Sequence, residues 1–305
     1  MTDQPALRIE NLKFRYHKRR RGEPWVIDIG ALTLARGEQV LLTGGSGRGK
    51  STLLHLIAGL MEPVDGETYV DGTPIHSLRG AQRDLFRGKR IGMIFQSFNL
   101  LHGFSALDNV LAALMFSSMP RKEHKRRALY LLKHLGIDHP RRNPDKMSVG
   151  QQQRVAVARA MACDPVLVLA DEPTASLDPD NALNAIELIQ SICREKNAAL
   201  LCVSHDPALR ERFARQASLD DLARGLAPQR PAIPMAAAAP PVEARQKAAG
   251  SDVEPVDHEE AEDDVELDLE GEVVRRDPLG ELGDVDDDDD ADDVNLKEQD
   301  EPLSR

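Results

Sequence analysis

The chain is poor in cysteine, and this excludes two classes of protein. Its 305 residues include three cysteines, an odd number at scattered spacings. Such a set argues against a disulfide framework and against a zinc site, and it favours a reducing compartment. Cys163, Cys193 and Cys202 each lie in an otherwise apolar segment, so we expect them to be small buried side chains.

Long apolar runs are also missing. No window approaches the roughly 18 consecutive apolar residues of a membrane span. The first residues, Met1 to Pro5, contain no apolar signal region. We therefore expect a cytoplasmic chain. If it works at a membrane, another chain must provide the spanning helices.

Charge of either sign is unevenly distributed. The formal net charge is −12, but residues 229–305 contain 7 Lys/Arg against 26 Asp/Glu, a net charge of −19, and residues 1–228 carry +7. This C-terminal part has few apolar residues and cannot repay the entropy lost on ordering. We predict a folded domain over residues 1–227 and a disordered tail, Ala/Pro-rich and then acidic, over residues 228–305. A solubilising role is favoured over a short partner-binding motif at residues 265–269.

One stretch, from Gly44 to Ser51, has the pattern G-x-x-x-x-G-K-S. An apolar run precedes it and an apolar segment closed by Gly59 follows it, which predicts a strand, a glycine-rich loop and a helix. In that context backbone N–H groups and the positive end of the helix dipole bind phosphate oxygens. Lys50 would reach the β- and γ-phosphates, and Ser51 would hold Mg²⁺. A chance match is the competing interpretation, and the flanking strand and helix argue against it.

The remainder of residues 1–227 alternates strands and helices, which predicts an α/β core with a parallel sheet. Turn signals around residues 67–70 predict a small antiparallel β subdomain, and residues 97–160 show the helical spacing of an insertion. The expected strands span residues 7–14, 26–34, 40–42, 67–70, 91–95, 166–170 and 199–203. The expected helices span residues 53–59, 79–87, 106–115, 120–135, 149–163 and 179–194.

An acidic pair, Asp171 and Glu172, follows the predicted buried strand at residues 166–170. Carboxylates at the C-terminal end of a strand beside a phosphate loop face the bound nucleotide. Asp171 can hold Mg²⁺, and Glu172 can orient and deprotonate the attacking water. The alternative is an acidic strand end that only caps the next turn, and the phosphate loop makes it the weaker interpretation.

These motifs together resemble the ATP-binding subunit of ABC transporters over about residues 6–225. They occur in the order and spacing of that family at residues 44–52, 96, 148–154, 171–178 and 205. The ordered set is far more specific than a phosphate loop alone, which many kinases and GTPases share. Residues 94–101 and 150–154 further resemble the macrolide-export and lipoprotein-release group. The resemblance implies a P-loop NTPase core and the hydrolysis of ATP to ADP and phosphate.

The resemblance also implies roles for individual residues. Tyr16 would stack on adenine, Gln96 would touch Mg²⁺ or the attacking water, and His205 would hydrogen-bond the γ-phosphate and steady Glu172. The implied catalytic set is Glu172, His205, Gln96 and Lys50. The implied metal set is Ser51, Gln96 and Asp171. The residues expected to contact ATP are Tyr16, Gly44, Gly45, Ser46, Gly47, Arg48, Gly49, Lys50, Ser51, Thr52, Ser148, Gly150 and Gln151.

A predicted helix begins near Ser148, and a helix N-terminus with a serine cap is an anion site. In the family this segment covers the γ-phosphate bound by a second copy, and residues near Asp178 line the same contact. The resemblance therefore implies a homodimer with two shared sites, whose monomer binds ATP and barely hydrolyses it. Met147 and Val149 stand where the family usually has leucine and glycine. Since a β-branched residue cannot take glycine's conformations, we expect dimer closure of altered tightness.

Three functions are compatible with the resemblance, and we favour the first. A transport ATPase would power a separate membrane permease docked against residues 98–114, at the inner face of the cell membrane. A non-transport ATPase would regulate cell-envelope or division machinery through a membrane partner. A DNA-repair or translation ATPase is disfavoured, because the chain lacks a long coiled-coil or zinc insertion and a tail of −19 opposes nucleic acid. The cargo is a property of the permease.

Overall fold

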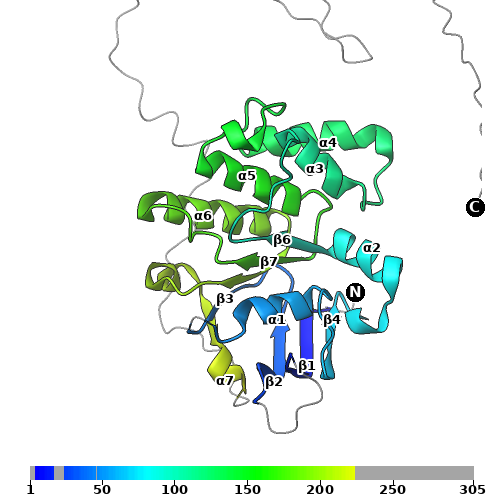
Figure 1. Cartoon of the computed structure of the whole chain (residues 1–305), viewed down its shortest axis with the longest axis vertical. Coiled ribbons are helices and arrows are strands. Elements are labelled where there is room, and N and C mark those ends of the chain that lie inside the picture. The colour runs from blue at the N-terminus through cyan, green and yellow to red at the C-terminus, as the bar shows by residue number, and fades with distance from the viewer. Residues whose placement is uncertain (1–3, 17–23, 46, 224–305) are drawn as a thin grey trace, which may run out of the picture. The chain divides into compact units, whose positions relative to one another are not determined.

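The computed structural model describes residues 4–16, 24–45 and 47–223. The predicted tail over residues 228–305 and the loop residue Ser46 lie outside these ranges. Two sheets and the helices around them make up the described part of the chain (Figure 1).

The predicted motif residues lie near the ends of strands in a parallel sheet of five strands. Its strand order is β6-β7-β8-β3-β9, and every neighbouring pair is parallel. The strands are β6 (Ile91–Ile94), β7 (Leu167–Asp171), β8 (Ala199–Val203), β3 (Gln39–Thr43) and β9 (Arg215–Ser218). Because all five run the same way, their C-terminal ends meet at one edge of the sheet, where doubly wound folds bind their ligands.

An antiparallel sheet forms the smaller β subdomain. Its order is β2-β1-β4-β5, with β1 (Leu7–Phe14), β2 (Ile27–Leu34), β4 (Asp65–Val70) and β5 (Thr73–Pro74). Buried and accessible residues alternate along β1, as the sequence pattern predicted for a strand with one face on the core, except that Glu10 and Asn11 are both accessible where the register with β4 shifts. The predicted antiparallel subdomain is confirmed.

Helices follow the strands and fill the insertion. The α-helices are α1 (Lys50–Ile57), α2 (Gly80–Arg90), α3 (Ala106–Leu114), α4 (Arg121–His134), α5 (Val149–Ala160), α6 (Pro179–Glu195) and α7 (Leu219–Ala223). Short 3₁₀ turns span Ile75–Ser77, Pro144–Lys146 and Pro207–Arg212. Helices α3, α4 and α5 form the predicted helical insertion (Figure 1), and α3 and α5 each begin with a serine capping box.

The parallel sheet separates two apolar cores. Leu200 and Cys202 of β8 face a core built with α3 to α6, whereas Leu201 and Val203 face a second core built with α1 and the antiparallel sheet. This alternation follows from the twofold period of a strand, and it explains why β8 is apolar at every position. A sheet covered on both faces holds its strand ends, and therefore the site, in fixed positions.

Two of the three cysteines are buried as expected, and the third is not. Cys193 and Cys202 are buried. Cys163 is half-buried because it lines an open cleft, where its Sγ donates to the Ala113 carbonyl (3.3 Å). Burial raises the pKa of the Cys163 thiol to about 11 and that of Cys193 to about 12, so both stay protonated at neutral pH.

The end of the folded domain was not predicted. Strand β9 and helix α7 follow β8, and the sequence analysis assigned no structure there. Both elements are short, and a four-residue strand such as β9 has too few residues to show a period. None of the helices in the described ranges is long and apolar enough to cross a membrane.

Candidate functional site

The glycine-rich loop joins β3 to α1, as predicted. Gly49 is the N-cap of α1 and has φ +94°, and a Cβ there would lie 3.0 Å from both the backbone oxygen and a side-chain carbon of Val26. Only glycine fits such a conformation and such a close approach. Gly47 also has positive φ, at +73°. The loop therefore turns its backbone back toward the start of α1, where N–H groups without helical partners can bind an anion.

Lys50 is the first residue of α1, and its side chain is only 8% exposed. Its Nζ donates to the carbonyl oxygens of Gly44 (2.8 Å) and Gly45 (3.2 Å). Nζ also lies 3.8 Å from Oε1 of Glu172. The ammonium group thus lies between the phosphate loop and the end of β7, and its present partners are ones that phosphate oxygens could replace.

Glu172 follows β7 and is held from two sides. Its backbone has φ +46°, and its N–H donates to the Val203 carbonyl of β8 (2.9 Å). Its side chain is 12% exposed, and Oε1 lies 2.8 Å from Nδ1 of His205. The left-handed backbone costs about 1 kcal/mol for a residue with a side chain. Here it aims the carboxylate at both Lys50 and His205.

We call Lys50, Asp171, Glu172 and His205 the strand-edge cluster. They lie at or just beyond the ends of three adjacent strands, β3, β8 and β7, at the shared C-terminal edge of the sheet. His205 is 69% exposed, so the cluster is open to solvent on one side. The structure therefore brings together four residues that lie up to 155 positions apart in the sequence.

Asp171 and Ser51 fit a magnesium ion bound with a nucleotide. Oδ1 of Asp171 is buried and has no hydrogen-bond partner in the described part of the chain. A buried carboxylate oxygen without a partner is costly, and a hydrated cation would relieve that cost. Ser51, at the start of α1, is exposed. Carboxylate, hydroxyl and water oxygens are the ligands that Mg²⁺ prefers.

Tyr16 lies just beyond β1, and its ring is 62% exposed. Its hydroxyl is 2.9 Å from Oγ1 of Thr52 in the first turn of α1. Its ring packs edge-to-face with the ring of Phe14, with the two centroids 5.1 Å apart. The ring is therefore anchored beside the phosphate loop with much of its surface free, as a stacking partner for a base requires.

Gln96 lies beyond β6, at the same edge of the sheet, because Ile94 pairs with Ala170 and Asp171 follows directly. Its side chain is exposed, and no hydrogen bond of that side chain is found within the described ranges. The backbone position fits the predicted role, whereas no hydrogen bond joins the amide to the strand-edge cluster.

Ser148, Val149, Gly150 and Gln151 open helix α5, and we call them the lid. Ser148 Oγ accepts from the Gln151 N–H (3.3 Å), and Gln151 Oε1 accepts from the Ser148 N–H (3.2 Å). Neither Val149 nor Gly150 has positive φ, so this conformation does not require glycine. What Val149 adds is an apolar side chain that is 44% exposed.

The partner of Arg48 was not predicted from the sequence. This loop residue forms an ion pair with Asp220 of α7, and Leu219 lies beside Gly44 at the start of the same loop. Helix α7 therefore contacts both ends of the phosphate loop. No local pattern signals this pair, because both side chains are exposed and the two residues lie 172 positions apart.

Comparisons with known proteins agree with this geometry. A family model described as "ABC transporter" matches residues 28–175. The lipoprotein-releasing system ATP-binding protein LolD of Bordetella avium (strain 197N) is 41% identical over 220 residues, which cover 71% of this chain and 95% of that protein.

Solved structures are similar as well. The dimeric post-hydrolysis state of the ATP-binding cassette MJ0796, bound to ADP and Pi, aligns with a TM-score of 0.62 and 32% identity over 70% of this chain and 93% of that one. CbiO1 from Clostridium perfringens, part of the transporter complex cbiONQ, aligns with a TM-score of 0.62 and 26% identity over 70% of this chain and 84% of that one.

Proposed function

This chain belongs to the ATP-binding subunits of ABC transporters, a family of ATPases, and we propose that it works as a homodimer that powers a separate membrane permease of the lipoprotein-release or export type. One observation carries the proposal. The Glu172 carboxylate lies between Lys50 (3.8 Å) and His205 (2.8 Å) at the end of a buried parallel sheet. A base, a cation and a hydrogen-bond donor at a phosphate loop are what hydrolysis of a phosphoanhydride requires.

The chemistry follows from these positions. Lys50 exchanges the carbonyls of Gly44 and Gly45 for β- and γ-phosphate oxygens when ATP enters. Glu172 accepts a proton from the water whose oxygen attacks the γ-phosphorus, and the bond to the bridging oxygen breaks to release ADP. His205 orients the carboxylate and donates to the γ-phosphate. Tyr16 stacks on the adenine.

A magnesium ion fits beside these residues. When bound, it would neutralise charge that develops on the phosphates. Ser51 and Asp171 would hold it, Asp171 through the buried Oδ1 that has no partner among the described residues. Gln96 would approach the same region from the end of β6.

The lid completes the site of a second copy. Its helix N-terminus suits a γ-phosphate, but it belongs to the insertion and not to the strand-edge cluster. Two copies of ATP-binding cassette MJ0796 form the dimer in the structures that this chain resembles. Two ATP molecules would thus lie between the phosphate loop of each copy and the lid of the other.

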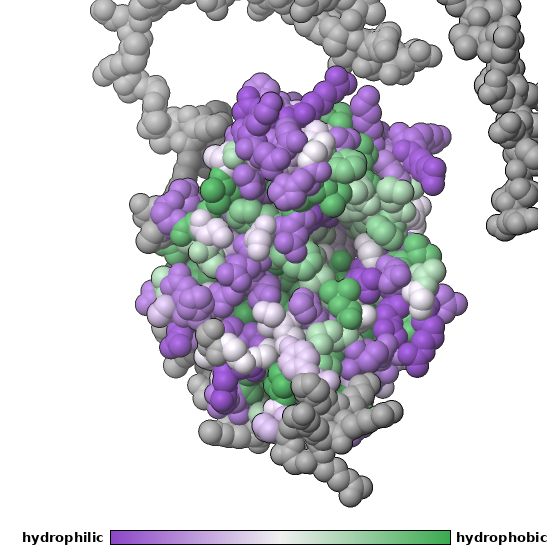
Figure 2. Space-filling model, viewed as in Figure 1, coloured by the Kyte–Doolittle hydropathy of each residue, from purple (hydrophilic) through white to green (hydrophobic). Residues whose placement is uncertain are grey.

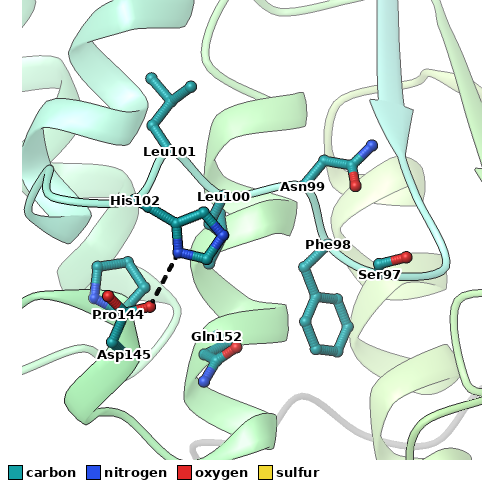
Figure 3. A pocket seen from close by; sticks show the side chains of 9 residues that line it. All are labelled: Ser97, Phe98, Asn99, Leu100, Leu101, His102, Pro144, Asp145 and Gln152. Carbon is teal, nitrogen blue, oxygen red and sulfur yellow. Dashed lines mark hydrogen bonds and ion pairs between the residues drawn. The ribbon is translucent and has the colours of Figure 1, made fainter.

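The permease would dock beside the insertion. Residues 97–102 line a pocket together with Pro144, Asp145 and Gln152 (Figure 3), and a second cleft next to it is lined by Met93, Phe95, Ala113 and Phe116 among others. Exposed apolar side chains lie nearby at Leu85, Met115 and Phe116, and Figure 2 shows hydrophobic surface between the insertion and α2. Residues 98–102 and Ala113 of the predicted docking segment, residues 98–114, line these clefts. Through this contact the chain would work at the inner face of the membrane.

The test is the Glu172→Gln variant of the full chain. It should bind ATP, accumulate as a dimer in size-exclusion chromatography with ATP, and lose at least about 100-fold in hydrolysis rate. ADP should not support the dimer. Glu187→Gln, a carboxylate of α6 outside the cluster, is the matched control and should behave as wild type. Hydrolysis by Glu172→Gln at near the wild-type rate would overturn the assignment of the base. Stimulation of the wild-type ATPase activity by a purified permease would favour the transport role over the regulatory role.

A further inference from the structure

Helix α5 holds the loop that follows Glu172. Gln153, in the second turn of the helix, is 2% exposed, and its Nε2 donates to the Pro173 carbonyl (3.0 Å). Pro173 directly follows Glu172, whose own carbonyl accepts from the Ala175 N–H (3.1 Å). A buried side-chain amide bonded to a backbone carbonyl fixes that carbonyl, because either group left alone would be a buried polar group without a partner.

The same helix holds the loop that follows Gln96. Arg159, in the last turn of α5, donates from Nη2 to the Phe98 carbonyl (2.6 Å) and from Nη1 to the Asn99 carbonyl. Both loop residues are in the left-handed region, at φ +58° and +48°. Two successive residues with side chains do not adopt this conformation without support, and a guanidinium fork that binds both carbonyls supplies it.

The turn so held begins at the end of β6. The Phe98 N–H donates to the Phe95 carbonyl (3.0 Å), so Gln96 lies inside the hydrogen-bonded turn. Phe98 also packs its ring inward, at 6% exposure, beside the pocket of Figure 3. A change in the Arg159 contacts would therefore move Gln96 and the proposed docking pocket together.

We infer that α5 is a positioning element for catalysis: from one rigid helix, Gln153 sets the loop of Glu172, Arg159 sets the loop of Gln96, and the N-terminus presents the lid. The inference rests on the proposed function for its link to hydrolysis. A helix of 12 residues is about 18 Å long and moves as one body. Docking at the Phe98 turn is thereby coupled to the lid at the far end of the helix and to both active-site loops beside it.

Two conservative variants of the full chain test the inference, each with a matched control. Arg159→Lys keeps the charge but cannot bind two carbonyls in a fork, and Gln153→Met keeps the size but removes the donor. Arg127→Lys alters a half-buried arginine of α4 that pairs with Asp164, and Gln190→Met alters a buried glutamine of α6 that donates to the Arg212 carbonyl. The controls remove similar contacts at places that hold no active-site loop.

The first readout is steady-state ATPase activity together with nucleotide affinity. Arg159→Lys and Gln153→Met should each lower kcat about tenfold, because a small misplacement of a catalytic group is costly, with KM and the Kd for ADP within about twofold of wild type. The two controls should keep kcat within about twofold, even where they lower the melting temperature. Equal loss of kcat in a variant and its control, or a loss of nucleotide affinity as large as the loss of kcat, would reduce α5 to a structural support and overturn the inference.

The second readout does not depend on hydrolysis. Backbone amide exchange in the nucleotide-free protein should speed up at residues 96–99 in Arg159→Lys and at Thr174 and Ala175 in Gln153→Met, and at neither place in the controls. Unchanged exchange at both loops overturns the inference whatever the ATPase result. A wild-type chain that binds ATP without hydrolysing it would instead overturn the proposed function, and amide exchange alone would then decide the role of α5.

Discussion

The strand-edge cluster and the lid, which we propose to bind the same phosphate group, are built in different ways. Lys50 and Glu172 are 8% and 12% exposed, and their side chains lie 3.8 Å apart at the C-terminal edge of a sheet that is covered on both faces. The lid is a helix N-terminus in which the side chains of Ser148 and Gln151 each accept from the other's backbone N–H, and Val149 is 44% exposed. In the proposed dimer, the strand-edge cluster would be complete within one copy, whereas the lid would act on the other copy.

This difference assigns separate jobs to the two halves. Preorganised charges at a buried edge suit binding and proton transfer, which need fixed distances. An exposed helix N-terminus gains a phosphate partner only when another surface approaches it, so its contribution depends on association. The first half should therefore determine whether nucleotide binds, and the second whether it is hydrolysed.

The largest effect on ATPase activity is expected from variants of the phosphate loop and of the lid, tested separately and then mixed. Lys50→Met and Ser148→Arg should each lower ATPase activity about 100-fold or more as pure proteins. An equal mixture should recover about a quarter of the wild-type rate, because half of the randomly formed dimers are mixed and each has one intact shared site. Activity is followed as the two proteins are titrated. A mixture no more active than its components would mean that lid and loop act within one copy.

Next in size is the loss of the hydrogen bond that orients the base. His205→Ala should lower kcat by about 10- to 100-fold, because Glu172 loses its 2.8 Å partner, while KM changes little. His134→Ala, at an exposed histidine of α4 that pairs with Glu195, serves as the control and should retain full activity. A rise in KM with kcat unchanged would place His205 in nucleotide binding alone.

A smaller effect should be seen on binding by a single copy. Tyr16→Ala should weaken nucleotide affinity about tenfold, because base stacking is worth about 1–3 kcal/mol, and Tyr16→Phe should stay within about twofold of wild type. The Kd is measured by fluorescence titration at protein concentrations where the chain is monomeric. Tyr130→Ala, an exposed tyrosine on α4, is the control. An equal loss of affinity in Tyr16→Phe and Tyr16→Ala would show that the hydrogen bond to Thr52, and not ring stacking, supports nucleotide binding.

The smallest effect concerns the apolar side chain in the lid. In a Glu172→Gln background, Val149→Gly should tighten the ATP-dependent dimer about two- to fivefold, because removing the isopropyl group lets the helix N-terminus approach the phosphate. Dimerisation is followed by analytical ultracentrifugation. Val149→Ala separates the two explanations: a full effect with alanine points to size, and a partial one to glycine's conformational freedom. A weaker dimer with glycine would show that the valine contributes contact area.

The sequence was sufficient to predict the elements that carry motifs. The pattern from Gly44 to Ser51 needs a strand before it and a helix after it, and β3 and α1 stand there. Adjacent carboxylates after an apolar run predicted the end of β7. These inferences succeeded because each rests on a local requirement, such as the positive φ of Gly49, that few sequences satisfy.

Contacts between distant residues could not be predicted in this way. Nothing in the local pattern pairs Arg48 with Asp220 or aims Arg159 at the Phe98 carbonyl, because these contacts join residues 61 to 172 positions apart. The left-handed backbone of Glu172 could likewise not be predicted from the sequence, since the neighbouring strand holds it through the Val203 carbonyl. The one available signal was chemical: an amide such as Gln153 within an otherwise apolar helix face must have a buried partner.

The two carbonyl partners of Lys50 bear on how the protein completes a cycle. When ADP and phosphate leave, a buried ammonium without a partner would cost several kcal/mol, and that cost would hold the products in place. Because the carbonyls of Gly44 and Gly45 take up the ammonium at 2.8 and 3.2 Å, the site can empty without this penalty. The phosphate loop therefore favours product release as well as substrate binding, so the protein does not remain trapped with ADP and phosphate bound.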